Sequence, residues 1–135
     1  MKVGFTCSSF DLLHAGHILM LKECKDKCDY LVVGLQTDPT IDREEKNKPV
    51  QNLFERFLQL DAISHIDKIY IYETEEELRQ LLYYVKPDIR FIGEDWRDKK
   101  FTGYIQVRLG QHEIHYNRRY GYSTSELRVR VKDAD

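Results

Sequence analysis

Short apolar segments rich in β-formers alternate with helical segments along the 135 residues of this chain. Residues 2–6 favour a buried strand, residues 15–27 a helix with an apolar stripe, and residues 30–35 a second strand. A strand, a helix and a strand within about thirty residues form a βαβ unit, whose strands are parallel and whose crossover is right-handed. Because the alternation continues to the end of the chain, we expect a single α/β domain over residues 1–135. It should contain a doubly wound parallel sheet of about five strands.

Capping residues and periodicity divide the remaining sequence in the same way. Asn52 is a favourable N-cap, Thr74 precedes three glutamates that suit the first turn of a helix, and Ser123 precedes the last helix. Residues 40–51 carry many charges and no apolar period, which predicts a long, mobile loop. The expected later helices run from residue 52 to about 65, 74–86, 102–109 and 123 to about 132, and the expected later strands cover 68–72, 89–92 and 113–116.

Composition excludes several classes of function. Hydrophobic residues make up 41% and charged residues 33% of the chain, which is typical of a soluble globular protein. A net charge of −2 favours neither a nucleic-acid nor a membrane partner, and no apolar run is long enough to span a bilayer. The three cysteines, with no secretory signal before them, predict reduced thiols and a cytoplasmic location.

Cys24 and Cys28 lie on one face of the first expected helix, and with His112 and His115 they could form a zinc site. Structural zinc pairs usually lie in loops, whereas these two cysteines continue the apolar stripe of the helix. A role as small core residues is therefore the favoured interpretation.

The strongest candidate for a functional site is the junction between the first strand and the first helix. His14 and His17 lie there with Gly16 between them, and Asp11 precedes the pair. Unpaired backbone N–H groups and the positive end of the helix dipole bind phosphate at such a junction, and imidazoles can add donors and charge. Asp38 follows the second strand, so we expect it at the same carboxyl edge of the sheet.

Three motifs in order carry a resemblance to a known family. Residues 9–17 closely resemble the HxGH motif of the nucleotidylyltransferase superfamily, and residues 118–125 resemble its second motif, a basic residue followed by a turn into the last helix. Residues 93–96, Gly-Glu-Asp-Trp, resemble a segment of the small cytidylyltransferases, and the glycerol-3-phosphate cytidylyltransferases are the most similar group. The resemblance covers nearly the whole chain and implies a Rossmann-like fold.

The resemblance implies that CMP is transferred from CTP to a small phosphorylated alcohol or polyol, such as glycerol 3-phosphate, and that pyrophosphate leaves. The CDP-alcohol would serve the synthesis of a surface polysaccharide or a teichoic-acid-type polymer. Mg²⁺ would be bound through the triphosphate, with no protein ligand assigned, and the protein would be a homodimer. Two positions depart from the family, Ser8 in place of a glycine and Ser64 in place of an acceptor-binding arginine, so other phosphomonoester acceptors are open.

The same resemblance implies roles for individual residues. The catalytic residues would be His14, His17, Lys46 and Arg119. The nucleotide would be bound by Ser8, Ser9, Phe10, Asp11, Gly16, Lys48, Gly93, Asp95, Arg118, Tyr122, Ser123, Thr124 and Ser125. The acceptor would be bound by Asp38, Arg56 and Trp96.

Several of these residues have a structural alternative. Asp38 could form a turn before Pro39, Arg56 could make only a surface ion pair, and Trp96 could be a core residue. Ser123 and Glu126 also form the pattern of a capping box, which is compatible with phosphate binding. The sequence does not decide between Lys46 and Lys48.

Two other functions remain open at this stage. An adenylyltransferase of the same superfamily, of the FAD synthetase or heptose-phosphate type, would use the same phosphate-binding residues. A non-catalytic nucleotide-binding module is the third alternative, and the intact HxGH motif argues against it.

Overall fold

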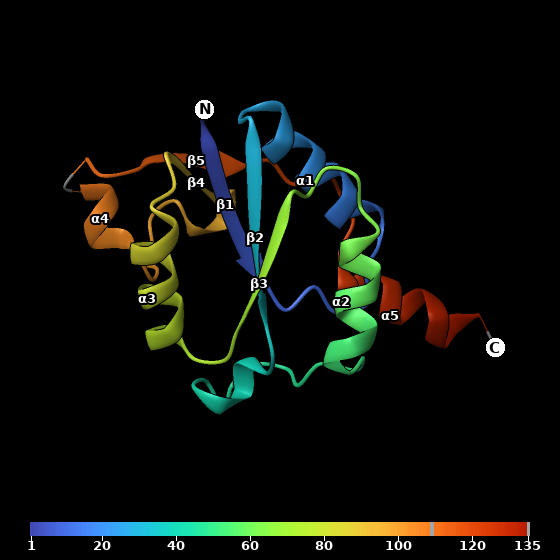
Figure 1. The fold of residues 1–135 in the computed structure, drawn as a ribbon. Coiled ribbons are helices and arrows are strands. Elements are labelled where there is room, and N and C mark those ends of the chain that lie inside the picture. The colour runs from blue at the N-terminus through green and yellow to red at the C-terminus, as the bar shows by residue number, and fades with distance from the viewer. Residues whose placement is uncertain (109, 135) are drawn as a thin grey trace.

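The computed structural model describes residues 1–108 and 110–134 as a three-layer α/β domain (Figure 1). Five parallel strands form one sheet in the order β3-β2-β1-β4-β5. The strands are β1 (Val3–Ser8), β2 (Tyr30–Gln36), β3 (Lys68–Tyr72), β4 (Ile89–Gly93) and β5 (Glu113–Asn117). The helices are α1 (Ala15–Asp26), α2 (Leu53–Asp61), α3 (Glu75–Val85), α4 (Tyr104–Arg108) and α5 (Thr124–Asp133), with 3₁₀ turns η1 (Pro39–Ile41) and η2 (Glu94–Trp96).

Both faces of the sheet are covered, and each has its own apolar core. In Figure 1, α1 and α2 lie on one side of the sheet, and α3 and α4 lie on the other. The core under α1 and α2 includes Leu21, Leu60 and Phe91, and the core under α3 includes Phe5 and Leu82. Two buried faces explain why β2 consists almost entirely of apolar residues.

The chain winds outward from β1 in both directions. It passes from β1 through β2 to β3 on one side, and then returns to β4 and β5 on the other side of β1. The order of the strands reverses between β1 and β4, and ligands of open α/β sheets bind at the carboxyl edge beside such a reversal. The topology therefore marks the ends of β1 and β4 as the place for a site.

The predicted Rossmann-like sheet of five parallel strands is confirmed, and the predicted N-caps are present. Asn52 and Thr74 each accept a hydrogen bond from the N3 backbone, and Glu55 and Glu77 bond back to them. The second helix was predicted to reach residue 65, but α2 ends at Asp61. It ends there because the chain turns twice, at Ile63 and again at Ile66, and both side chains pack against the α1 and α2 core.

The charged segment between β2 and α2 is confirmed as a loop, with one 3₁₀ turn at η1. Contacts hold both of its ends. Asp42 accepts a hydrogen bond from the backbone of Glu75 at 2.5 Å, and Arg43 pairs with the Glu75 carboxylate at 3.3 Å. At the other end, the N–H groups of Val50 and Gln51 each donate to a buried carboxylate at 2.9 Å. The predicted mobility of this loop stays a prediction.

Candidate active site

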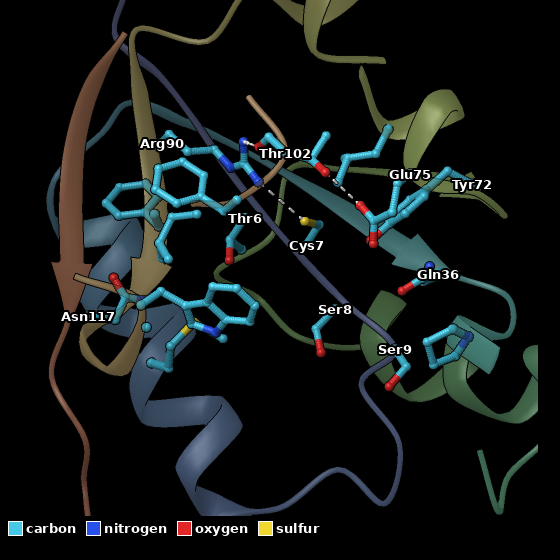
Figure 2. A pocket seen from close by; sticks show the side chains of 18 of the residues that line it. Thr6, Cys7, Ser8, Ser9, Gln36, Tyr72, Glu75, Arg90, Thr102 and Asn117 are labelled. Atoms are coloured by element: carbon cyan, nitrogen blue, oxygen red, sulfur yellow. Dashed lines mark hydrogen bonds between the residues drawn. The ribbon is translucent and has the colours of Figure 1, made fainter. Parts of the chain in front are cut away.

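A cavity of about 400 Å³ opens at the carboxyl edge of the sheet, where the strand order reverses (Figure 2). The ends of β1, β2, β3 and β4 form its floor, and the loop between β2 and α2 and the segment after β4 form its walls. Of the residues that the sequence assigned to the site, the cavity is lined by Ser8, Ser9, Lys46, Gly93, Trp96, Arg118 and Arg119. His14 and His17, at the start of α1, are not among the residues that line it.

The two histidines of the HxGH motif cap α1 with their own side chains. His14 Nδ1 accepts a hydrogen bond from the backbone N–H of Gly16 at 3.0 Å, and His17 Nδ1 accepts one from the backbone N–H of His14 at 3.1 Å. Since a backbone N–H can only donate, both Nδ1 atoms must be unprotonated. Each neutral ring therefore carries its proton on Nε2, as an N–H donor.

The surroundings of these rings keep them uncharged. Burial lowers the pKa of His14, and burial together with the neighbouring His14 lowers the pKa of His17 to about 4, although Asp11 acts in the opposite direction. The centres of the two imidazole rings lie 4.1 Å apart, and the centre of the His17 ring lies 5.8 Å from the centre of the Phe10 ring. Without a ligand both rings are therefore neutral near pH 7. The expectation that the imidazoles add charge beside a bound phosphate stays a prediction, whereas the expectation that they add donors has a geometric basis.

The second motif meets the first across about a hundred residues of sequence. A Cβ added to Gly16 would lie 2.9 Å from Tyr122 Cβ and 2.8 Å from His14 Cε1, so only glycine permits this approach. The hydroxyl of Thr124, at the start of α5, lies 3.5 Å from the carbonyl oxygen of Asp11. Ser123 caps α5 by accepting a hydrogen bond from the backbone N–H of Glu126 at 3.1 Å. The N-terminus of α5 therefore lies beside that of α1, and both favour anions.

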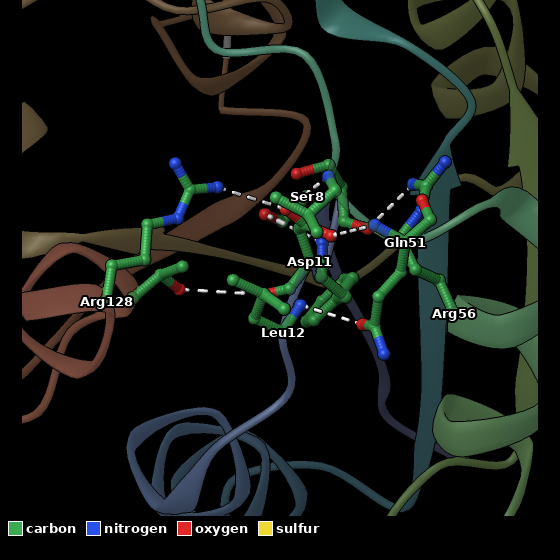
Figure 3. Close-up of polar contacts among 10 residues, drawn as sticks. Ser8, Asp11, Leu12, Gln51, Arg56 and Arg128 are labelled. Atoms are coloured by element: carbon green, nitrogen blue, oxygen red, sulfur yellow. Dashed lines mark hydrogen bonds and ion pairs between the residues drawn. The ribbon is translucent and has the colours of Figure 1, made fainter. Parts of the chain in front are cut away.

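Asp11 joins three segments at this point (Figure 3). Its carboxylate accepts the backbone N–H groups of Val50 and Gln51 at 2.9 Å each, and it pairs with Arg128 of α5 at 3.3 Å. The residues on either side of it, Phe10 and Leu12, have positive φ angles of 49° and 51°, which cost free energy in non-glycine residues. Asp11 was predicted to bind the nucleotide. Its contacts give it the role of positioning the HxGH turn, the loop and α5.

Arg56 does not have the geometry predicted for it. Its side chain is only 2% exposed, and four backbone carbonyl groups accept from it. They belong to Ser9 at 2.9 Å, Gln36 at 2.6 Å, Thr37 at 2.5 Å and Gln51 at 3.1 Å. A guanidinium has five N–H donors, so nearly all are used within the protein. Arg56 therefore ties together the ends of β1, β2 and the loop before α2, and neither acceptor binding nor a surface ion pair describes it.

The basic residues of the site differ in position. Lys46 lines the cavity with its ammonium group 5.8 Å from the Trp96 ring centre. Lys48 is exposed and lies near Asp38, outside the lining. The Arg118 guanidinium lies over the Tyr120 ring, 5.0 Å from the ring centre. Arg119 is exposed, and its backbone N–H donates to the Glu94 carboxylate at 3.3 Å. The geometry thus favours Lys46 over Lys48 as the loop lysine that meets a ligand.

Asp38 and the segment after β4 occupy the rim of the cavity. The Asp38 carboxylate caps η1 by accepting from the backbone N–H of Thr40 at 2.9 Å and from its hydroxyl at 2.6 Å, and these bonds lower its pKa. The turn-forming alternative for Asp38 is therefore present in the structure. A Cβ on Gly93 would lie 2.6 Å from the Asp95 carboxylate, which folds back over it. Asp95 and Ser125 are exposed, outside the lining.

Sequence reasoning missed several residues of the cavity. Arg90 of β4, Gln36 of β2 and Asn117 of β5 are buried polar residues at its wall, and Arg43 pairs with Glu75 there. The signal that could have found Arg90 is a charged residue inside an otherwise apolar strand, Ile-Arg-Phe-Ile.

The zinc alternative has no support. Cys24 is fully buried in the α1 core, its thiol contacts Asn117 at 3.2 Å, and burial raises its pKa to about 12. His115 bonds to Glu23 at 2.7 Å instead. Among the described residues, no group of three or more His, Cys, Asp and Glu side chains is arranged to hold a metal ion. Within residues 1–108 and 110–134, every helix is also too short or too polar to cross a membrane.

The fold and the paired helix N-termini define this protein as an α/β nucleotidyltransferase of the HxGH type. A family model described as cytidylyltransferase-like matches residues 5–130, and the chain belongs to this family.

Curated relatives refine the comparison. The chain is 34% identical over 136 residues to the bifunctional protein HldE of Campylobacter jejuni, an alignment that covers 98% of this chain and 28% of that protein. It is 32% identical to the bifunctional protein HldE of Caulobacter vibrioides, over 97% of this chain and 27% of that protein. The chain therefore spans little more than a quarter of the length of these relatives.

Solved structures agree with the fold. The lipopolysaccharide core biosynthesis protein from Thermoplasma volcanium superposes with a TM-score of 0.74 at 27% identity, covering 89% of this chain and 98% of that one. The pantothenate synthetase from Thermus thermophilus superposes with a TM-score of 0.62 at 15% identity, over 86% of this chain and 55% of that one, which shows a shared fold alone.

The relatives correct the leading expectation about the reaction. Transfer of CMP from CTP to a polyol phosphate was expected, but the HldE relatives favour the alternative, an adenylyltransferase of the heptose-phosphate type. The family resemblance was right at the level of the superfamily. The substrate class was wrong because the phosphate-binding motifs, which carried the resemblance, are the same in both groups.

Proposed function

We propose that this chain transfers AMP from ATP to a sugar phosphate, giving an ADP-sugar and pyrophosphate. The observation that carries the nucleotidyl transfer is the pair of imidazole caps beside the N-terminus of α5. The similarity to HldE and to a lipopolysaccharide core biosynthesis protein supports ATP and a sugar phosphate as the substrates.

In this reaction an oxygen of the sugar phosphate attacks the α-phosphorus of ATP, and the bond from that phosphorus to the β-phosphate oxygen breaks. Such a step needs no protein nucleophile, only positioning and stabilisation of the developing charge. The Nε2–H groups of His14 and His17 would donate to oxygens of the triphosphate. Arg119 and the N-terminus of α5 would hold the departing pyrophosphate.

Mg²⁺ would reach the site on the triphosphate, which supplies the hard oxygen ligands that this ion prefers and the described residues do not cluster to provide. Lys46, on the loop beside Trp96, would add a cation from the opposite wall of the cavity. A homodimer and a cytoplasmic location remain predictions from the sequence.

The test is pyrophosphate release by the purified chain with Mg²⁺ and either ATP or CTP. An aldoheptose 1-phosphate, glucose 1-phosphate and glycerol 3-phosphate serve as acceptors. We expect turnover with ATP and a sugar 1-phosphate, with little from CTP or glycerol 3-phosphate. Preferential turnover of CTP would refute the proposed donor, and no turnover with any acceptor despite tight nucleotide binding would favour a binding module.

A further inference from the structure

Arg90 is a buried cation that the reaction described above does not use. It lies on β4 opposite Phe5 of β1, is only 2% exposed and contributes to the wall of the cavity. In Figure 2 its guanidinium lies between Thr102 and Cys7. One Nη atom donates to the Thr102 carbonyl at 2.7 Å, the other lies 3.8 Å from Cys7 Sγ, and Nε has no partner among the described residues.

No carboxylate of the described chain lies within ion-pair distance of Arg90. Glu75 is the carboxylate on the same cavity wall, but it pairs with Arg43 at 3.3 Å and accepts from the Thr102 hydroxyl at 2.9 Å. The charge of Arg90 is also felt at buried His112, whose pKa is lowered by burial and then by Arg90. A buried charge without an oppositely charged neighbour destabilises the folded protein, and an anion that entered the cavity beside Arg90 would remove this destabilisation.

Arg56 provides the contrast within the same protein. It is equally buried, but four backbone carbonyl groups accept its donors. Arg90 has one such carbonyl and a weak contact with a thiol, and its other neighbours include the Phe5 and Phe101 rings at 5.6 Å each and Gly103, none of which carries a negative charge. Contacts within the folded chain therefore explain why Arg56 is buried, but they do not explain why Arg90 is buried.

The position of Arg90 separates it from the residues that would hold the triphosphate. It belongs to the face of the sheet covered by α3, since it contacts Phe5 of that core, whereas His14 and His17 begin α1 on the opposite face. It also lies three residues before Gly93 at the strand end, a distance of about 10 Å along an extended strand. An anion at Arg90 would thus be remote from the reacting phosphates.

We propose that Arg90 binds a second anionic group of the acceptor, a phosphate or a carboxylate remote from the phosphate that attacks ATP. This inference rests on the proposed function for the identity of the acceptor. The cavity of about 400 Å³ reaches from Ser8 and Ser9 at the edge to Arg90 at the inner wall, which suits a small sugar with a charge at each end. Arg90 would then select such acceptors over neutral sugar monophosphates.

Binding can be tested without turnover. The Nε–H resonance of Arg90, assigned by its absence in Arg90→Lys, should shift when inorganic phosphate is titrated into ¹⁵N-labelled protein. The same shift should remain in Arg119→Ala, which weakens the predicted triphosphate site. Failure of the resonance to shift would overturn the anion site, whatever the reaction of the protein is.

The selectivity is tested with three acceptors, an aldose 1-phosphate, the corresponding 1,ω-bisphosphate and the corresponding uronic acid 1-phosphate. In Arg90→Met we expect the KM of the preferred dianionic acceptor to rise about 10–100-fold, which is typical for loss of a charge-assisted contact. The KM values of ATP and of the monophosphate should not change. The acceptor whose KM rises identifies the anion as phosphate or carboxylate.

Arg79→Met, on the exposed face of α3, is the matched control and should leave every KM unchanged. The unfolding free energy of Arg90→Met should not fall, because the variant removes an unpaired buried charge. Equal loss with all three acceptors, or a destabilised fold with unchanged selectivity, would give Arg90 a purely structural role. Absence of turnover with any acceptor would contradict the proposed function. The phosphate titration would still show whether an anion binds at Arg90.

Discussion

The side chains of His14 and His17 do two things at once. Their Nδ1 atoms satisfy backbone donors at the start of α1, and this leaves Nε2–H on each ring for a ligand. His14 is the N-cap and His17 the N3 residue of α1. The usual N-cap residues, Ser, Thr, Asp and Asn, accept in the same way, but their short side chains place no N–H donor on the far side of a ring, as Nε2 does. The use of imidazoles at both positions therefore couples the folding of the α1 start to the orientation of the donors.

His17→Asn separates these two roles. The amide oxygen of asparagine can replace Nδ1 as the acceptor for the His14 backbone N–H, but nothing replaces Nε2–H. We expect turnover to fall at least ~10²–10³-fold, the usual effect of one preorganised donor, with an unfolding free energy close to that of the wild type. Steady-state kinetics and urea denaturation measure the two effects. Wild-type turnover in this variant would rule out donation by His17.

The lowered pKa of His17 predicts a pH dependence of stability. The folded protein protonates this ring only near pH 4, whereas the unfolded chain does so near 6.5. As the pH falls through this window the unfolded state binds the additional proton, so the unfolding free energy falls. Above pH 6.5 the contribution of the neutral ring is fully present, and below about pH 4 no further loss comes from it.

Urea denaturation at pH 7 and pH 5 measures this loss. Wild type should lose about 1–2 kcal/mol more than His17→Asn, because the variant lacks the group that titrates. The comparison between the two proteins cancels the other titrating groups. Equal losses in both would show that His17 has an ordinary pKa.

At the scale of elements, charged side chains satisfy backbone groups where strands and helices end. Asp11 accepts N–H groups from the loop before α2, and Arg56 donates to carbonyls at the ends of β1 and β2. These irregular segments cannot pair with each other as strands do, so their buried polar groups need side-chain partners. The shape of the sheet edge therefore depends on two charged side chains, Asp11 and Arg56, which the sequence had suggested as ligand-binding residues.

Arg56→Met should destabilise the fold. It leaves one buried and three partly buried carbonyl groups without their donor, and we expect the unfolding free energy to fall by about 2–4 kcal/mol. Arg56→Lys should rescue little, because an ammonium has only three donors without the planar spread of a guanidinium. Chemical denaturation measures the change, with Arg79→Met as the exposed control. A normal stability combined with a raised acceptor KM would restore the acceptor-binding interpretation.

At the scale of the whole molecule, the site is assembled from both ends of the chain. The HxGH turn follows β1, and the second motif follows β5, two strands away in the sheet. The contacts of Gly16 with Tyr122 and of Asp11 with Thr124 and Arg128 close this gap. A nucleotide that contacts both segments would stabilise the folded domain as a unit.

Thermal denaturation in the presence of Mg²⁺ tests this coupling and the choice of nucleotide. A ligand at a hundred times its Kd adds about 2.7 kcal/mol to the unfolding free energy. We therefore expect ATP to raise the Tm by several degrees, and CTP at the same concentration to raise it less. A larger effect of CTP would contradict the proposed donor.

Much of the fold could be predicted from the sequence, because its signals are local. The five strands and the capped starts of α2 and α3 follow from periodicity and from Asn52 and Thr74. The end of α2 could not, since Ile63 and Ile66 turn into a core that forms only when β3 is in place. The same holds for the site. The histidine motif could be recognised in the sequence, but the sequence could not show that Arg56 and Arg90 are both buried and have different partners.

The sequence by itself determined the class of fold, the position of the phosphate-binding turn and the superfamily, because periodicity, capping and short motifs depend on residues close together in the chain. Only the tertiary structure decided which side chains are free to meet a ligand. His14 and His17 keep a free donor, Asp11 and Arg56 are used by backbone groups, and Arg90 is buried without an anion. Availability depends on burial and on partners that are distant in sequence, and these are set only when the chain has folded.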